Sequence, residues 1–254
     1  MGCLFIFLCV ILLPVVADAV FVAVREVFQL RDGGGRADAG VVIFVKLRWL
    51  GARWGTRSVA AGLRRAGFDG KFLYWQWHAM WRGWLVLPVI MDARLLETQA
   101  RRLAAFIVKQ SRAQPDRPIS LIGYSCGSCV TVRTLELLPP DVSVQDVVLL
   151  AAACDPRRDL RDACSRVRGC FVNVSSWLDW LIVGMGTLVF GTGDRRHTIS
   201  AGMCGFRQHR KPSNLVEQRW RPGMMRHGHF GGHFSAASAW QMAAIWREKT
   251  ANGE

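Results

Sequence analysis

The sequence predicts an α/β protein, in which helices cover both faces of a mostly parallel sheet. Short apolar runs rich in β-branched residues alternate with longer segments that carry apolar residues at helical spacing, as in βαβ units. The chain has 254 residues, of which 51% are hydrophobic and 20% charged, so it can bury a large core. We expect one domain over residues 40–254, preceded by an apolar segment (1–30) and a Gly-rich connector (31–39).

The expected elements follow one another along the domain. Each strand is a short apolar run, and each helix carries its apolar residues on one side. The strands are expected at 41–45, 72–77, 118–124, 146–151 and 170–175, and the helices at 57–65, 93–110, 128–138 and 235–246. Sheets of this kind carry their active sites at the carboxyl ends of the strands.

The N-terminal segment is an almost unbroken apolar run over residues 4–24, interrupted by Pro14 and Asp18. About 20 apolar residues cross a bilayer as a helix, so membrane association through an anchor is one interpretation. The first basic residues follow the run, which favours the cytoplasmic face for the body of the protein. A signal peptide cleaved near Ala19, followed by export, and a buried first helix are the alternatives.

The charge balance does not by itself indicate nucleic acid. The 33 Lys and Arg residues outnumber the 19 Asp and Glu residues, which gives a net charge of +14. The cations are scattered along the chain rather than gathered in one stripe, so nucleic-acid binding is not expected. Attraction to anionic lipid headgroups or to acidic substrates explains the charge equally well.

A nucleophile motif stands at the end of the third expected strand. Gly123-Tyr124-Ser125-Cys126-Gly127 fits the pattern G-x-S-x-G, in which a serine occupies a sharp turn between a strand and a helix. A side chain at either glycine would collide with the neighbouring strand or helix across such a turn. We therefore expect Ser125 to present its hydroxyl as a nucleophile.

A serine nucleophile needs a base to take its proton and a carboxylate to orient that base. Asp179 follows the strand 170–175 and is the expected acid, with Asp194 as the alternative. His229, in a Gly-flanked loop before the last helix, is the favoured base. His233 in the same loop is the alternative base, because its position next to the helix also suits a packing or capping role.

An oxyanion hole should accompany this serine. The backbone N–H of Cys126 is the first expected donor, and a second is expected from residues 47–53, after the first strand. Chemistry of this kind requires no cofactor or metal. The sequence does not indicate the acyl group, the leaving group or the oligomeric state.

These motifs together resemble the α/β-hydrolase superfamily over residues 40–248. The resemblance implies Ser125 as nucleophile, Asp179 as acid and His229 as base, with hydrolysis of a carboxylic ester, a thioester or a lipid acyl bond. The substrate is then a small molecule or a lipid. Only two strands are expected before the motif, so the first antiparallel strands of the family are expected to be missing.

Two other functions remain open from the sequence. Cys126 and Cys129 form a C-x-x-C motif at a strand-to-helix junction, as in thiol oxidoreductases. Alternatively, the hydrolase scaffold serves as a membrane-anchored binding module without catalysis. The Trp-rich run 74–84 fits a membrane interface, an acyl pocket or ordinary core packing.

Overall fold

The structure, a computed structural model, describes residues 35–47, 55–77 and 93–251. Six strands form one sheet in the order β2-β1-β3-β4-β5-β6, and each neighbouring pair is parallel. The strands are β1 (Arg36–Leu47), β2 (Gly70–Trp77), β3 (Ile119–Tyr124), β4 (Val147–Leu150), β5 (Phe171–Ser175) and β6 (Leu215–Arg219). The predicted α/β class and parallel sheet are confirmed, and no antiparallel pair occurs among the described residues.

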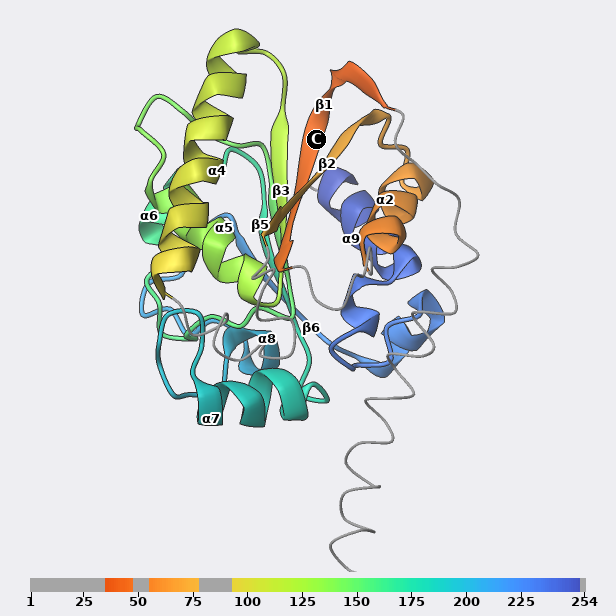
Figure 1. The fold of residues 1–254 in the computed structure, drawn as a ribbon. Coiled ribbons are helices and arrows are strands. Elements are labelled where there is room, and N and C mark those ends of the chain that lie inside the picture. The colour runs from red at the N-terminus through yellow and green to blue at the C-terminus, as the bar shows by residue number, and fades with distance from the viewer. Residues whose placement is uncertain (1–34, 48–54, 78–92, 252–254) are drawn as a thin grey trace, which may run out of the picture.

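Helices cover both faces of the sheet (Figure 1). One face carries α4 (Ala93–Ala113), α5 (Cys126–Glu136) and α6 (Arg161–Ser165), and the other carries α2 (Thr56–Arg65) and α9 (Ala239–Ala251). Strand β1 shows why two cores form, because Val41, Ile43 and Val45 pack on the first face while Val42 and Phe44 pack on the second. Each large side chain buried in this way contributes about 1.5–3 kcal/mol.

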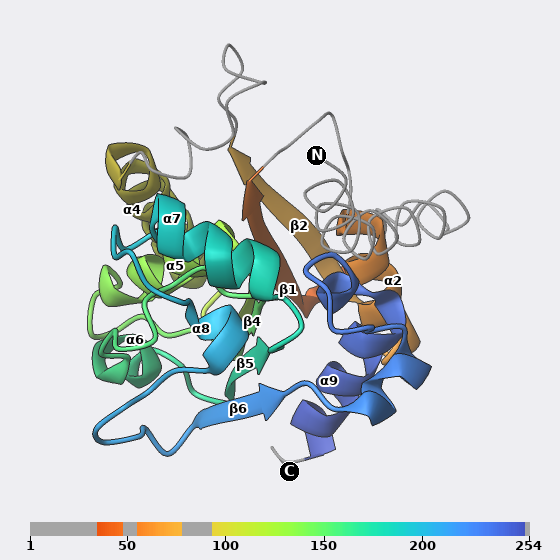
Figure 2. The same ribbon diagram turned by 90° about the horizontal axis from the view of Figure 1, so that it is seen from below.

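Short helices gather at the carboxyl end of the strands, onto which Figure 2 looks. A π-helix, η1 (Trp180–Gly186), follows β5 and continues directly into α7 (Thr187–Phe190). The remaining ones are α8 (Ala201–Cys204) and the 3-10 helices η2 (Pro222–His227) and η3 (Ser235–Ala237). The carboxyl ends of the strands are therefore surrounded by these short helices.

Several boundaries differ from the prediction. Strand β1 begins at Arg36, inside the expected connector, because Arg36 pairs with Gly70 before an irregularity that ends at Val41. The expected helix from residue 235 is a 3-10 turn followed by α9. Strand β6 was not predicted, since its edge position leaves a polar sequence in which only Leu215 is buried.

Among the described residues, no helix is both long and apolar enough to cross a bilayer. The expected anchor or signal segment, including Ala19, lies outside those residues. Positions 78–84 of the Trp-rich run lie outside them as well, whereas positions 74–77 belong to β2.

Candidate active site

Ser125 lies at the sharp junction between β3 and α5. Its backbone has φ 54° and ψ −124°, a conformation that residues other than glycine rarely adopt. Such a backbone costs on the order of 1–3 kcal/mol and persists where the surroundings enforce it. The Ser125 N–H donates to the Leu150 carbonyl at 2.9 Å, and the Ala153 N–H donates to the Ser125 carbonyl at 3.1 Å. The turn is therefore held from β4 and the loop that follows it.

The two glycines of the motif are sterically required. A Cβ on Gly123 would lie 2.8 Å from the Cα of Ser128, on the first turn of α5. A Cβ on Gly127 would lie 2.1 Å from the carbonyl oxygen of Val45, at the end of β1. Backbone atoms cannot yield to such contacts, so the close approach of α5 to the strands depends on both positions.

Asp179 and His233 form a buried pair. The Nδ1 atom of His233 lies 2.7 Å from Oδ2 of Asp179, and the two residues are 7% and 4% exposed. A carboxylate accepts hydrogen bonds only, so Nδ1 carries the proton and donates it to this contact. The Nε2 atom of the neutral ring is then an acceptor, which is the tautomer that a general base for serine requires.

A glycine allows the loop that carries His233 to pack closely against the segment that carries Asp179. Gly231 has φ 88°, and a Cβ there would lie 2.5 Å from Cδ1 of Leu178, next to Asp179. The loop also contacts the nucleophile strand, because the Tyr124 hydroxyl donates to the His233 carbonyl at 3.1 Å. The rings of Tyr124 and His233 are 5.2 Å apart. The acid–histidine pair is thus tied to the residue that precedes Ser125.

His229, the favoured base of the sequence prediction, has a different environment. It is 1% exposed, and the Gly231 N–H donates to its Nδ1 at 3.3 Å, so the ring proton resides on Nε2. Among the described residues this Nε2 has no hydrogen-bond partner. Burial lowers the pKa of His229 to about 4. The structure therefore places His233, the alternative base of the sequence prediction, against Asp179 in place of the favoured His229.

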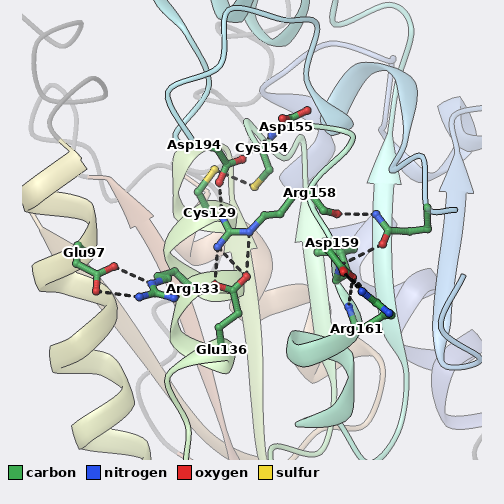
Figure 3. A network of polar contacts seen from close by, with 12 residues as sticks. Glu97, Cys129, Arg133, Glu136, Cys154, Asp155, Arg158, Asp159, Arg161 and Asp194 are labelled. Carbon is green, nitrogen blue, oxygen red and sulfur yellow. Dashed lines mark hydrogen bonds and ion pairs between the residues drawn. The ribbon is translucent and has the colours of Figure 1, made fainter. Parts of the chain in front are cut away.

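Asp194, the alternative acid, belongs to another network (Figure 3). Its carboxylate pairs with the Arg158 guanidinium and accepts the Asp155 N–H at 2.5 Å. Arg158 also contacts both carboxylate oxygens of Glu136 at 2.8 Å. Asp194 therefore joins the turn after α7 to the loop after β4 instead of contacting a histidine, and Arg158 extends this network to α5.

The nucleophile turn, the parallel sheet and the buried acid–histidine pair occur together in one chain. The serine follows β3, the acid follows β5, and the histidine lies in the loop before the last helix, in that chain order. The chain has the α/β-hydrolase fold. Among the described residues the first two strands, β1 and β2, pair in parallel, and the segment before them in which antiparallel strands would occur lies outside those residues.

Residues 91–194, which include the nucleophile turn and Asp179, match a family described as "Protein of unknown function (DUF726)". No curated protein matches the chain.

Three similar solved structures carry hydrolase titles. A dienelactone hydrolase from Anabaena variabilis is 15% identical, with a TM-score of 0.47 and coverage of 87% of this chain and 89% of that one. A lipase-esterase related protein from Clostridium acetobutylicum is 12% identical, with a TM-score of 0.45 and coverage of 87% and 97%. A cutinase-like protein from Cryptococcus sp. is 14% identical, with a TM-score of 0.40 and the same coverage of 87% and 97%. At these scores the assignment of fold rests on the topology of this chain.

Cys126, the residue expected to supply the first oxyanion donor, is the first residue of α5. Its N–H directly follows the nucleophile, as oxyanion stabilisation requires. Positions 48–53 of the segment expected to supply the second donor lie outside the described residues.

The C-x-x-C motif does not form a thiol pair. Cys126 and Cys129 are both buried, and the Sγ of Cys129 lies 2.8 Å from the Sγ of Cys154 instead. Burial, together with the Cys154 thiol, raises the pKa of Cys129 well above its ordinary value. An attacking thiolate needs the opposite, an accessible sulfur with a lowered pKa, so this geometry does not favour the oxidoreductase alternative.

A possible set of metal ligands lies beside this pair. Ligand atoms of Cys129, Cys154 and Asp194 lie within 4.8 Å of one another. Arg158 already neutralises the Asp194 carboxylate, and burial disfavours ionisation of the thiols. The residues present therefore fit an ion pair better than a cation site.

A cavity of about 400 Å³ lies between β6, η2 and α9. Its lining includes Val172, Arg219, Met224 and Gln241, and it includes none of the Ser125, Asp179 and His233 side chains. This cavity and the candidate catalytic residues therefore lie at different places in the fold.

Proposed function

We propose that the protein is a serine hydrolase that cleaves a carboxylic ester, a thioester or a lipid acyl bond. Ser125 is the nucleophile, His233 the general base, and Asp179 the group that orients His233. The observation that carries the proposal is the 2.7 Å contact between Asp179 and His233, tied through Tyr124 to a serine in a strained turn.

The reaction begins with attack of the Ser125 hydroxyl oxygen on the acyl carbonyl carbon. His233 Nε2 accepts the hydroxyl proton, while Asp179 stabilises the imidazolium that forms. The Cys126 N–H donates to the oxyanion of the tetrahedral intermediate. His233 then gives its proton to the leaving group, and an acyl-enzyme remains on Ser125.

Water completes the cycle by the same steps. His233 accepts a proton from the water molecule, and the hydroxide adds to the acyl carbonyl. Collapse of the second intermediate releases the carboxylic acid and returns the proton to Ser125. The 2.7 Å contact between Asp179 and His233 matters in both halves of the reaction, because each half needs Nε2 as an acceptor at its start.

The test is covalent labelling of the folded full chain with a fluorophosphonate, which reacts with activated serines. The variants are Ser125→Ala, His233→Ala and His229→Ala, with His209→Ala as the matched control because His209 is exposed. Labelling should vanish in Ser125→Ala. It should fall by about 10²-fold or more in His233→Ala, since general-base catalysis contributes about that much, and persist in His209→Ala.

The His229→Ala variant decides between the two histidines. Labelling that persists there and falls in His233→Ala supports the proposed base. The reverse result restores His229 as the base and overturns the assignment. Absence of labelling in the folded wild type would overturn the hydrolase proposal and favour a binding module without catalysis.

A further inference from the structure

The helical run after Asp179 exposes large apolar side chains. Trp177, in the turn before it, is 62% exposed, and Val189 is 55% exposed. We call the following residues the η1–α7 surface: Trp177, Trp180, Met185, Leu188, Val189 and Phe190, all of which are exposed. Apolar patches of this kind on a folded protein mark sites where a partner or a membrane binds.

The inner side of the run is firmly attached to the protein. Val183 is fully buried, and the Ser200 hydroxyl donates to its carbonyl at 2.7 Å. A Cβ on Gly184 would lie 2.7 Å from the sulfur of Met203, so η1 packs closely against α8. Because this inner side is fixed by packing and hydrogen bonds, the η1–α7 surface is held facing outward.

The exposed charge next to this surface is positive. Residues 177–199 contain two acids, Asp179 and Asp194, and both are paired and largely buried. Arg195 and Arg196 are exposed in the turn after α7. His197 Nδ1 lies 3.2 Å from the Leu188 carbonyl, which holds this basic turn against α7.

A second segment with the same character lies alongside. The Trp177 ring contacts the Trp220 ring edge to face, with centroids 6.1 Å apart. Residues 220–247 contain no acid. The exposed side chains of this segment include Arg221, Met225, Arg226 and Phe230. Both segments belong to the carboxyl end of the sheet that faces the viewer in Figure 2.

We propose that the η1–α7 surface docks onto a membrane surface that contains anionic phospholipids. The apolar side chains enter the boundary between headgroups and acyl chains, and the arginines pair with lipid phosphates and carboxylates. A second copy of this chain would bring the same cations face to face, whereas an anionic lipid surface complements them. The docking concerns binding alone and does not depend on the reactivity of Ser125.

If the η1–α7 surface docks onto the membrane, its residues should contact lipid, and photo-cross-linking tests this. The full chain is mixed with phosphatidylcholine vesicles with and without phosphatidylserine, both containing a phosphatidylcholine with a photoreactive diazirine in its acyl chain. After irradiation, cross-linked peptides are mapped by mass spectrometry. Capture on vesicles alone is not informative, because residues 4–24 are strongly apolar. Cross-links are expected in peptides that contain residues 177–190, with a yield that rises when phosphatidylserine is present.

Charge reversal supplies the matched control. Arg195→Glu/Arg196→Glu should lower the cross-linking yield at residues 177–190 by about tenfold or more. Arg102→Glu/Arg112→Glu, which changes two exposed arginines on α4, should leave the yield unchanged. Fluorophosphonate labelling or, if the protein proves inactive, circular dichroism reports that each variant is folded. Cross-links confined to other parts of the chain, or equal yields with and without phosphatidylserine, would overturn the proposal.

Discussion

Two aspartates at the carboxyl end of the sheet have different partners. Asp179 pairs with the His233 imidazole, and Asp194 pairs with the Arg158 guanidinium. Both carboxylates are removed from water, and both follow glycine- or serine-containing turns. An imidazole exchanges its proton near neutral pH, whereas a guanidinium keeps its charge throughout the accessible range. The partner of each aspartate therefore distinguishes the proposed catalytic pair from the Arg158 ion pair.

The surroundings of the two pairs agree with this difference. The Asp179 pair connects two loops and a strand end, through Gly231 against Leu178 and Tyr124 against His233. The Arg158 pair extends to Glu136 and so fastens the loop after β4 to α5. Burial raises the pKa of Asp194 even though the Arg158 charge opposes that effect. The second network thus depends on its cation to keep the carboxylate ionised.

The largest expected effect comes from making Asp179 neutral, and the same change at Asp194 is the comparison. Asp179→Asn should lower ester hydrolysis about 10⁴-fold, or about 5 kcal/mol of transition-state stabilisation, because the amide favours the wrong imidazole tautomer. Asp194→Asn should leave the hydrolysis rate within a few-fold of wild type. Hydrolysis of a chromogenic short-chain ester measures both rates. Equal losses in the two variants would contradict the division of roles.

The next effect is on stability. Arg158→Met leaves the Asp194 carboxylate buried without its cation, so the free energy of unfolding should fall by about 3–5 kcal/mol. Urea denaturation at neutral pH measures the change. Arg161→Met is the control, because the Arg161–Asp159 pair is exposed and should contribute nothing measurable. Similar losses in both variants would show that burial does not distinguish these pairs.

The smallest expected effect is on the pH dependence of stability, and it concerns His229, a buried group for which burial alone shifts the pKa. His229 has its pKa lowered from 6.5 to about 4 in the folded state, so the unfolded chain binds its proton first as the pH falls. The free energy of unfolding should therefore decrease between about pH 6.5 and pH 4, and His229 should account for about 3 kcal/mol of that loss. His229→Gln should remove this contribution to the pH-dependent loss of stability. Urea denaturation of both proteins across that range measures it, and parallel pH profiles would contradict it.

The fold was largely predictable from residue patterns. Buried strands such as β3 and β4 are short and uniformly apolar, so their periodicity is visible in the sequence. Strand β6 was missed, because an edge strand needs few apolar side chains. The run over η1 and α7 was missed as well, since a π-helix in a segment this apolar has no distinct spacing.

The candidate site was predictable only in part. The G-x-S-x-G pattern and the place of Asp179 after a strand are local features, and both residues lie where the sequence indicated. The identity of the histidine that pairs with Asp179 could not be read from local sequence. His229 and His233 share one glycine-rich loop. The loop contacts Leu178 through Gly231 and Tyr124 through the His233 carbonyl, and these partners are distant in the chain.

The sequence by itself determined the parallel α/β architecture, the sharp turn at Ser125 and the order of serine, acid and histidine. Hydrophobic periodicity and the two glycines of the G-x-S-x-G motif are both visible within short stretches of the sequence. The tertiary structure alone decided that Asp179 faces His233, that Asp194 faces Arg158 and that His229 is buried. Each of these outcomes depends on the packing of loops against one another, and burial and pairing of charges arise only when the whole chain is folded.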